Sequence, residues 1–294
     1  MNIYIFLMMQ SFFYNIGSKV IIKAVMTYKQ SKYMPTIQYI KNNKNNQIFG
    51  EHEKESFLNQ NEFIKNKKII SISPGGYKGI YMLGICMYMK EHFDLSDFIF
   101  SGSSAGAWNA LMMCYNKDNS LLKHDIVDYS VKNSKSLNQI EMMMKTRILE
   151  KCSQDDFDLR RLFIGVTTVN NYRANITIFS GFDSLEDSID CCVASSHIPL
   201  VTGGFVNKYN NMYSFDGGFS KYPYLNITQS VLHITPSIWT KKRENPSLIQ
   251  DINDYTTLFS KNNFDFDKMY KNGYEDAHKN CVFLKHVLDT EFIE

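Results

Sequence analysis

Short apolar runs alternate with longer stretches of mixed polarity from about residue 68 onward. An apolar run between turn signals predicts a buried strand, and apolar positions that recur every three or four residues predict a helix. This pattern predicts strands at 69–73, 97–101, 162–169, 176–180 and 231–234, a hairpin turning at 208–211, and helices at 79–92, 105–115, 185–195 and through most of 247–294. Strands separated by helices indicate an α/β fold, with a largely parallel sheet sandwiched between helices in three layers.

The pattern is weaker before residue 68. Residues 41–48 form a polar low-complexity run, which is the best linker in the chain. We therefore expect residues 1–67 to be an N-terminal extension with a polar linker, and residues 68–294 to form the domain that carries the function.

The first thirty residues carry an ambiguous apolar signal. Residues 2–13 are apolar but lack the features of a signal peptide, and polar residues interrupt them before the ~20 residues that a membrane-spanning helix needs. Lys19 and Lys23 beside apolar neighbours are compatible with a helix that contacts a membrane peripherally. The weak pattern favours an extension that packs on the domain or is partly disordered.

Composition and cysteine spacing limit the kinds of molecule and metal that we expect this protein to bind. A net charge of +2 over 294 residues predicts no nucleic-acid or other polyanionic partner. The six cysteines show no spacing typical of a zinc site or a disulfide framework, so we expect free thiols and no metal. Free thiols indicate a reducing compartment, hence a cytoplasmic protein that is either free or membrane-associated.

The best candidate nucleophile follows the strand predicted at 97–101. Gly102, Ser103, Ser104, Ala105 and Gly106 fit the pattern G-x-S-x-G between an apolar strand and an apolar helix. A serine at such a sharp turn projects its hydroxyl outward, and small residues two positions away let strand and helix approach closely. Ser104 is therefore the expected nucleophile, at the amide-rich start of a helix.

A glycine-rich loop follows the strand predicted at 69–73. Residues 74–79 read PGGYKG, which matches neither a P-loop nor a dinucleotide-binding fingerprint. The backbone amides of Gly75, Gly76 and Tyr77 can point toward one position and donate hydrogen bonds to a negatively charged oxygen there. Because this loop precedes the serine turn by one strand–helix unit, it is a candidate oxyanion hole.

The expected base is Asp216. A serine needs a base at neutral pH, and Asp216 lies at the end of a predicted strand before Gly217 and Gly218. The alternative is a histidine, as in Ser-His-Asp esterases. His197 and His233 are the candidates for that arrangement, although neither lies in a convincing catalytic loop.

These motifs resemble those of the patatin-like phospholipases. The family has a glycine-rich oxyanion loop, a G-x-S-x-G turn and a later D-G-[AG] motif, which match residues 74–79, 102–106 and 216–218. Residues 194–199 (ASSHIP) and 272–277 (NGYEDA) are similar to two further family segments. The similarity spans about residues 68–280, with Pro74 replacing the first glycine of the loop.

The resemblance implies a patatin-like three-layer fold and an acyl hydrolase of the phospholipase A type or a related lipase. It implies that a Ser-Asp dyad cleaves phospholipid or neutral lipid esters through an acyl-enzyme, without a metal or organic cofactor. A catalytically degenerate lipid-binding module of the same fold remains an alternative. The positions expected to support the motifs are Lys78, Gly79, Gly102, Gly106, Gly217 and Gly218.

Overall fold

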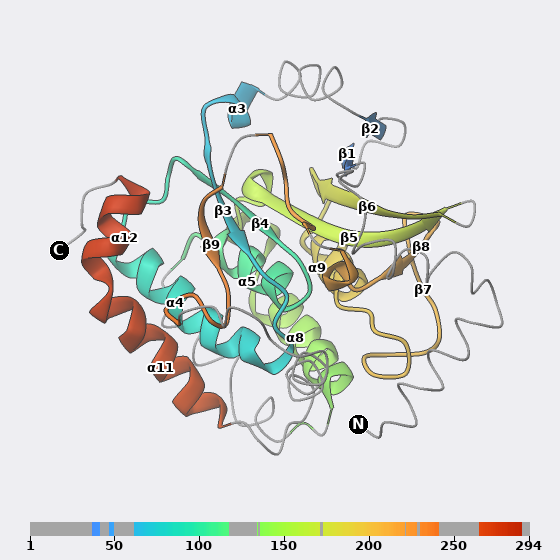
Figure 1. Ribbon diagram of the computed structural model, residues 1–294. Helices are drawn as coiled ribbons and strands as arrows, with labels where there is room; N and C mark the ends of the chain where they lie inside the picture. The colour runs from blue at the N-terminus through green and yellow to red at the C-terminus, as the bar shows by residue number, and fades with distance from the viewer. Residues whose placement is uncertain are drawn as a thin grey trace.

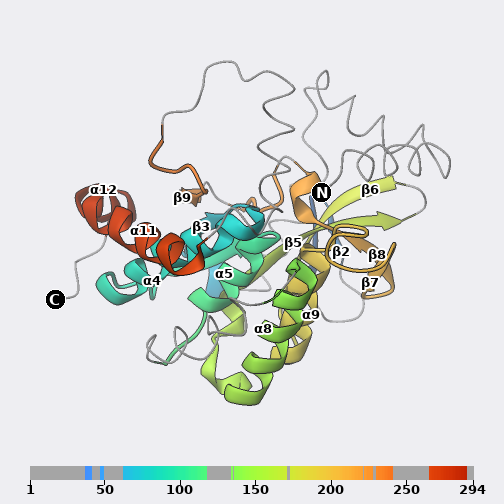
Figure 2. The ribbon, with the colours of Figure 1, turned by 90° about the horizontal axis from the view of Figure 1, so that it is seen from below.

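The computed structural model describes residues 62–117, 134, 136–170, 173–220, 222–227, 230–240 and 265–289, together with the backbone of two short strands at 37–41 and 47–49. A twisted sheet forms the centre of the molecule, with helices packed against it (Figures 1 and 2). The α/β fold with helices on both faces of a sheet is confirmed.

Within the described residues the sheet has nine strands, with the order β2-β1-β6-β5-β4-β3-β9 and the pair β7–β8 attached to β5. The strands are β1 (Ile37–Lys41), β2 (Gln47–Phe49), β3 (Lys68–Ile72), β4 (Phe98–Gly102), β5 (Leu162–Asn170), β6 (Arg173–Ser180), β7 (Asn207–Tyr209), β8 (Met212–Phe215) and β9 (Ser230–Ile234). The central strands β5, β4, β3 and β9 are parallel, whereas β6 and β8 run antiparallel to β5.

The helices are α3 (Glu62–Lys65), α4 (Gly79–His92), α5 (Ala105–Met113), α8 (Leu137–Lys151), α9 (Leu185–Ser195), α11 (Phe266–Lys279) and α12 (Cys281–Leu288). Four single 3₁₀ turns are η1 (Gly76–Lys78), η2 (Gln154–Asp156), η3 (Leu159–Arg161) and η4 (Gly217–Phe219). No helix in the described part of the chain has the length and apolar character needed to cross a membrane.

Alternation along the central strands separates two apolar clusters. Ile70 and Phe100 pack in the large cluster with α4, α5 and α9, whereas Ile69 and Ile99 pack in a smaller cluster with Ile64 of α3 on the opposite face. Successive side chains of a strand point to opposite faces, so strands covered on both sides read as unbroken apolar runs.

The N-terminal segment contributes to the sheet. Strand β1 pairs with β6 in parallel and with β2 in antiparallel orientation, which extends the sheet by two strands beyond β6. The helix considered at residues 19–26 and the apolar stretch at 2–13 lie outside the described residues. The boundary at residue 67 stays a prediction.

Candidate active site

The backbone at Ser104 has an unusual conformation. Ser104 stands between β4 and α5 with φ 55° and ψ −128°, which is rare for a residue other than glycine. A Cβ at Gly102 would clash with the Gly106 carbonyl, and a Cβ at Gly106 would clash with the Ile72 carbonyl. The two glycines thus allow β3, β4 and α5 to approach closely enough to hold the turn.

Asp216 lies beside this serine at the end of β8. The Ser104 Oγ donates a hydrogen bond of 2.6 Å to Asp216 Oδ2, and both side chains are buried. The Gly218 amide donates to Asp216 Oδ1 at 2.6 Å, and the Thr167 hydroxyl donates to the Asp216 carbonyl at 2.9 Å. The turn after Asp216 thereby holds the carboxylate, and β5 holds the backbone that carries it.

Burial changes the acidity of Asp216. Loss of hydration raises the pKa of its carboxyl group from 3.8 to about 6, although the hydrogen bonds from Ser104 and Gly218 favour the ionised form. A carboxylate with a raised pKa binds a proton more tightly, so Asp216 is a stronger base than an exposed aspartate.

The glycine-rich loop lies on the other side of the serine. Gly76 and Tyr77, in η1, line the same pocket as Ser104, and Gly76 has a left-handed backbone with φ 50°. Gly75 and Lys78 are not among the lining residues, and the Gly75 carbonyl accepts the Lys78 amide at 3.0 Å. The structure therefore places at the pocket two of the three residues whose amides are expected to form the oxyanion hole.

The remaining motif glycines allow close packing around the serine. A Cβ at Gly217 would clash with the Ser103 hydroxyl, and a Cβ at Gly79 would lie 2.7 Å from that of Ala105. These positions bring the start of α4 and the turn after Asp216 against the serine turn.

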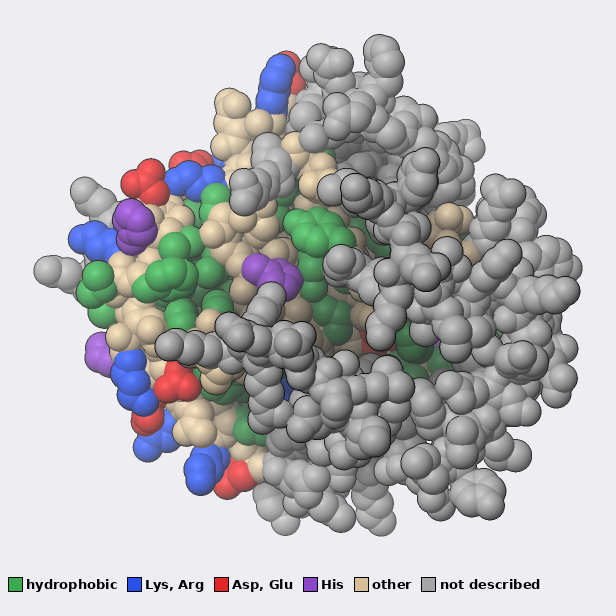
Figure 3. All heavy atoms as spheres, viewed as in Figure 1, with side chains coloured by type: hydrophobic (Ala, Val, Ile, Leu, Met, Phe, Trp, Pro, Cys, Tyr) green, Lys and Arg blue, Asp and Glu red, His purple; other side chains and the backbone are tan. Residues whose placement is uncertain are grey.

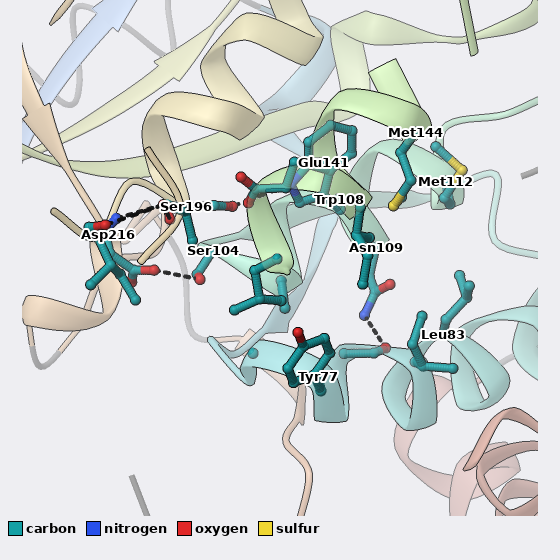
Figure 4. Close-up of a pocket in the computed structure, with 18 of the residues that line it drawn as sticks. Tyr77, Leu83, Ser104, Trp108, Asn109, Met112, Glu141, Met144, Ser196 and Asp216 are labelled. Carbon is teal, nitrogen blue, oxygen red and sulfur yellow. Dashed lines mark hydrogen bonds between the residues drawn. The ribbon is translucent and has the colours of Figure 1, made fainter. Parts of the chain in front are cut away.

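An apolar pocket extends from the Ser104–Asp216 pair between α4, α5 and α8 (Figure 4). Leu83, Met112 and Met144 are seen at the end away from the pair. Other apolar lining residues are Ile80, Met87, Trp108, Leu137, Ile140 and Ile198. Such a lining suits a hydrocarbon chain, which gains about 0.8 kcal/mol for each buried CH₂ group.

A model of the patatin-like phospholipases matches residues 70–225, which is more than half of the chain. The chain belongs to this family. No curated protein and no solved structure matches the chain in the same comparisons. Membership of the patatin-like family places the chain among lipid acyl hydrolases in general.

In this patatin-like site, the Ser195 side chain holds the backbone of Ser104. Its Oγ accepts the Ser104 amide at 2.8 Å and donates to the Gly165 carbonyl at 2.7 Å. Sequence reasoning noted residues 194–199 as a family segment but gave Ser195 no role. A signal was present in the sequence, because Ser195 ends α9 directly after the apolar run at 191–194.

Glu141 is a pocket residue that sequence reasoning missed. It lies on α8, is buried, and lines the pocket together with Trp108 and Ser196, whose side chains hydrogen-bond to it. Burial raises the pKa of its carboxyl group well above the ordinary value, and the nearby Asp216 charge adds to this shift. Burial therefore favours the protonated form of Glu141, which can donate a hydrogen bond.

Helix α8 itself was not predicted. Leu137, Ile140 and Met144 follow the helical spacing, but Glu141 occupies an inward position of the same stripe. A charged residue type at a buried position breaks the apolar period on which the prediction depends.

Within the described residues, no histidine side chain is hydrogen-bonded to the side chain of Ser104 or Asp216. The His197 ring is buried against Phe215, and within the described residues its Nε2 has no hydrogen-bond partner. His233 lies on β9, where its Nδ1 is 2.8 Å from the Ser71 hydroxyl. No group of three or more metal-ligating side chains occurs among the described residues.

Proposed function

We propose that this protein is a serine lipid acyl hydrolase of the phospholipase A type or a related lipase, with Ser104 as nucleophile and Asp216 as base. The observation that carries the proposal is the 2.6 Å hydrogen bond between their side chains at one end of an apolar pocket. We assign the activity to a domain formed by residues 68–294.

In the first half of the reaction, the Ser104 Oγ attacks the ester carbonyl carbon while Asp216 takes the hydroxyl proton. The amides of Gly76 and Tyr77, with Gly75 from the same loop, stabilise the negative charge on the carbonyl oxygen. The carbon–oxygen bond to the leaving alcohol then breaks. Asp216 returns the proton to that alcohol, which leaves Ser104 esterified by the acyl chain.

In the second half, water takes the place of the alcohol. Asp216 removes a proton from this water as its oxygen attacks the acyl-enzyme carbonyl. Collapse of the second tetrahedral intermediate breaks the bond to Ser104, whose oxygen regains the proton from Asp216. The products are a free fatty acid and the unmodified enzyme, so neither a metal nor an organic cofactor enters the reaction.

The Ser-His-Asp alternative lacks comparable support. Proton transfer requires heavy atoms about 2.6–3.2 Å apart, and the Ser104 hydroxyl meets that condition with Asp216. Since His233 bonds to Ser71 on another strand, Asp216 is the better base. A His197→Ala variant should therefore keep the ability to form an acyl-enzyme, whereas Asp216→Asn should lose it.

Covalent labelling tests this proposal. A fluorophosphonate probe should label the wild-type protein at Ser104, and Ser104→Ala should not be labelled. Equal labelling of Ser104→Ala would refute the assignment, and absence of labelling in the wild type would favour the degenerate lipid-binding module.

Lipid profiling then assigns the substrate class. Wild type and Ser104→Ala are incubated with mixed phospholipids and neutral glycerides, and the products are identified by mass spectrometry. Lysophospholipid released only by the wild type would identify a phospholipase A, and release from glycerides alone would identify a lipase. No release from either class by the wild type would refute lipid hydrolysis.

A further inference from the structure

Four large apolar side chains are exposed on two segments next to Asp216. Leu200, Phe205 and Val206 lie between α9 and β7 and are 49%, 52% and 60% exposed, and Phe219 in η4 is 46% exposed. We refer to these four residues as the apolar rim. Single exposed apolar residues are common on proteins, but a group of large ones marks a binding surface.

Hydrogen bonds bring the two segments together. The Asp216 amide donates to the His197 carbonyl at 2.8 Å, and the His197 ring bonds to the backbone of Phe205. The Leu200 amide donates to the Gly204 carbonyl at 3.4 Å, which folds the loop back on itself. The segments that carry the rim are thus attached to each other and to the base of the proposed dyad.

The loop has one buried side and one exposed side. Ile198 and Thr202 are buried and line the pocket, whereas Leu200 between them is exposed. Leu200 has φ 64°, a left-handed conformation that is strained for a leucine. Strained positions persist where the surrounding structure fixes them, and they cluster at ligand sites. The fold therefore holds an apolar side chain outward directly beside the pocket wall.

Charge around the rim favours a lipid surface. Between residues 196 and 220 the only lysine, arginine, aspartate or glutamate residues are Lys208 and the buried Asp216. The Lys208 ammonium lies 4.9 Å from the centre of the partly exposed Tyr213 ring. Tyrosine and lysine beside exposed apolar residues are typical of proteins that contact membrane interfaces, and residues 196–220 contribute no exposed carboxylate that would repel anionic lipids.

We propose that the apolar rim is the surface by which the protein docks on a lipid bilayer, with Lys208 and Tyr213 at the level of the headgroups. Docking there brings the bilayer to the outer side of the loop whose inner side lines the pocket. The inference rests on the proposed function only for the identity of the substrate, because bilayer binding itself requires no catalysis.

Vesicle binding tests the proposal with a matched control. The rim variant carries Leu200→Asn, Phe205→Ser and Val206→Ser. The control carries Val282→Ser and Phe283→Ser on α12, which are also exposed (79% and 47%) but lie on the opposite side of the molecule from β7 and β8 (Figures 1 and 2). Figure 3 shows apolar side chains gathered over α12.

Binding is measured by co-sedimentation with phosphatidylcholine–phosphatidylglycerol vesicles. We expect the rim variant to bind about tenfold more weakly than wild type, and the α12 control to bind like wild type. Should the rim variant fail to fold, the single change Val206→Glu at the most exposed rim position replaces it, with the same expectation. Wild-type-like binding by a folded rim variant, or equal loss in the control, would overturn the proposal.

Two further measurements separate docking from catalysis and from self-association. The rim variant should hydrolyse p-nitrophenyl butyrate, a soluble ester, within about twofold of the wild-type rate, and Ser104→Ala should bind vesicles normally. If the wild type binds vesicles but hydrolyses no ester, the catalytic proposal fails while docking stands. If the rim variant converts a wild-type dimer to a monomer in sedimentation velocity and still binds vesicles, the rim is an interface between copies and docking is refuted.

Discussion

At the scale of single residues, the site contains two buried carboxyl groups with different roles. In the proposed reaction Asp216 takes the Ser104 proton and must be ionised to act, whereas burial favours the neutral form of Glu141. Pairs of titratable groups whose environments move their pKa values differently often divide acid and base functions. Both groups also oppose stability at high pH, because folding removes their ionised forms from water.

Replacing Asp216 should abolish activity and at the same time increase stability. A pKa of about 6 in the folded state against 3.8 corresponds to about 3 kcal/mol of destabilisation once the group is ionised. The folded protein binds more protons than the unfolded chain between these two values, so its stability falls as pH rises through that window. Asp216→Asn should abolish labelling by fluorophosphonate but increase the free energy of unfolding.

Urea unfolding at two pH values checks this prediction. The gain for Asp216→Asn should be full near pH 8 and should vanish near pH 4, where the wild-type carboxyl is largely protonated in the folded state. A gain of the same size at both pH values would contradict the assignment of the effect to ionisation.

Glu141→Gln should change how the stability of the protein depends on pH. The amide resembles the protonated acid in shape, so the variant should fold and keep the contacts with Ser196 and Trp108. Above pH 4.5 the unfolded wild type releases a proton that the folded state keeps, so wild-type stability falls relative to the variant by about 1.4 kcal/mol per pH unit. Parallel pH profiles of thermal stability for the two proteins would refute a neutral Glu141.

Ser195 should act on turnover rather than on substrate affinity. Ser195→Ala removes the hydroxyl oxygen that accepts the Ser104 amide, so the strained turn can shift and misplace the Ser104 hydroxyl. We expect kcat to fall about tenfold to hundredfold with little change in KM. Ser103→Ala is the matched control, because its hydroxyl bonds to the same Gly165 carbonyl but not to Ser104. An equal loss in the control would contradict the positioning role.

At the scale of elements, the strands from β3 onward and most helices could be predicted because turn residues or polar residues mark their ends, whereas β1 and β2 lie in the segment interpreted as an extension with a polar linker. Asn210 and Asn211 both have left-handed backbones in the predicted turn between β7 and β8, as the side chains of asparagine allow. Helix α4 matches its predicted limits but is buried along most of its length. Its outer side is covered by α11, a contact that the local pattern of α4 could not reveal.

The contact between α4 and α11 depends on glycines. A Cβ at Gly84 would clash with the Tyr270 carbonyl, and a Cβ at Gly273 would clash with the Tyr81 carbonyl. This explains the glycine of the motif at 272–277, since backbone meets backbone there. The Tyr81 hydroxyl also donates to Asp276 at 3.0 Å, which secures the same pair of helices.

Gly84→Ala should therefore destabilise the fold by about 2 kcal/mol, although alanine favours a helix more than glycine does. Helices α4 and α11 must move apart to make room for the methyl group, and this movement weakens the packing of the side chains between them. Gly204→Ala is the control, because a Cβ there meets nothing within 4 Å, and its effect should stay within about 0.5 kcal/mol. Urea unfolding measures both, and equal effects would contradict the packing argument.

At the scale of the whole molecule, the motifs could be recognised because each one occupies a few consecutive positions of the sequence. The contacts that require their glycines are long-range, since Gly106 packs against Ile72 and Gly217 packs against Ser103. Likewise, the pocket is assembled from α4, α5 and α8, which lie far apart in sequence. The roles of Glu141 and of the apolar rim could not be predicted from the sequence, because they depend on this assembly and a single glutamate or phenylalanine is not part of a recognisable motif.

The length of the pocket should set the preferred acyl chain. Met144 lies at the end of the pocket away from Ser104 and Asp216, so Met144→Trp should fill that end while leaving the dyad unchanged (Figure 4). Each methylene that no longer fits forfeits about 0.8 kcal/mol, so excluding two or three of them should shift kcat/KM toward short-chain esters by at least about tenfold. A series of p-nitrophenyl esters from butyrate to palmitate measures this shift. Met142→Trp serves as the control on the same helix, because Met142 is half exposed and does not line the pocket. An unchanged chain-length profile in Met144→Trp would show that the acyl chain lies elsewhere, since a chain that occupies this pocket must meet the new side chain.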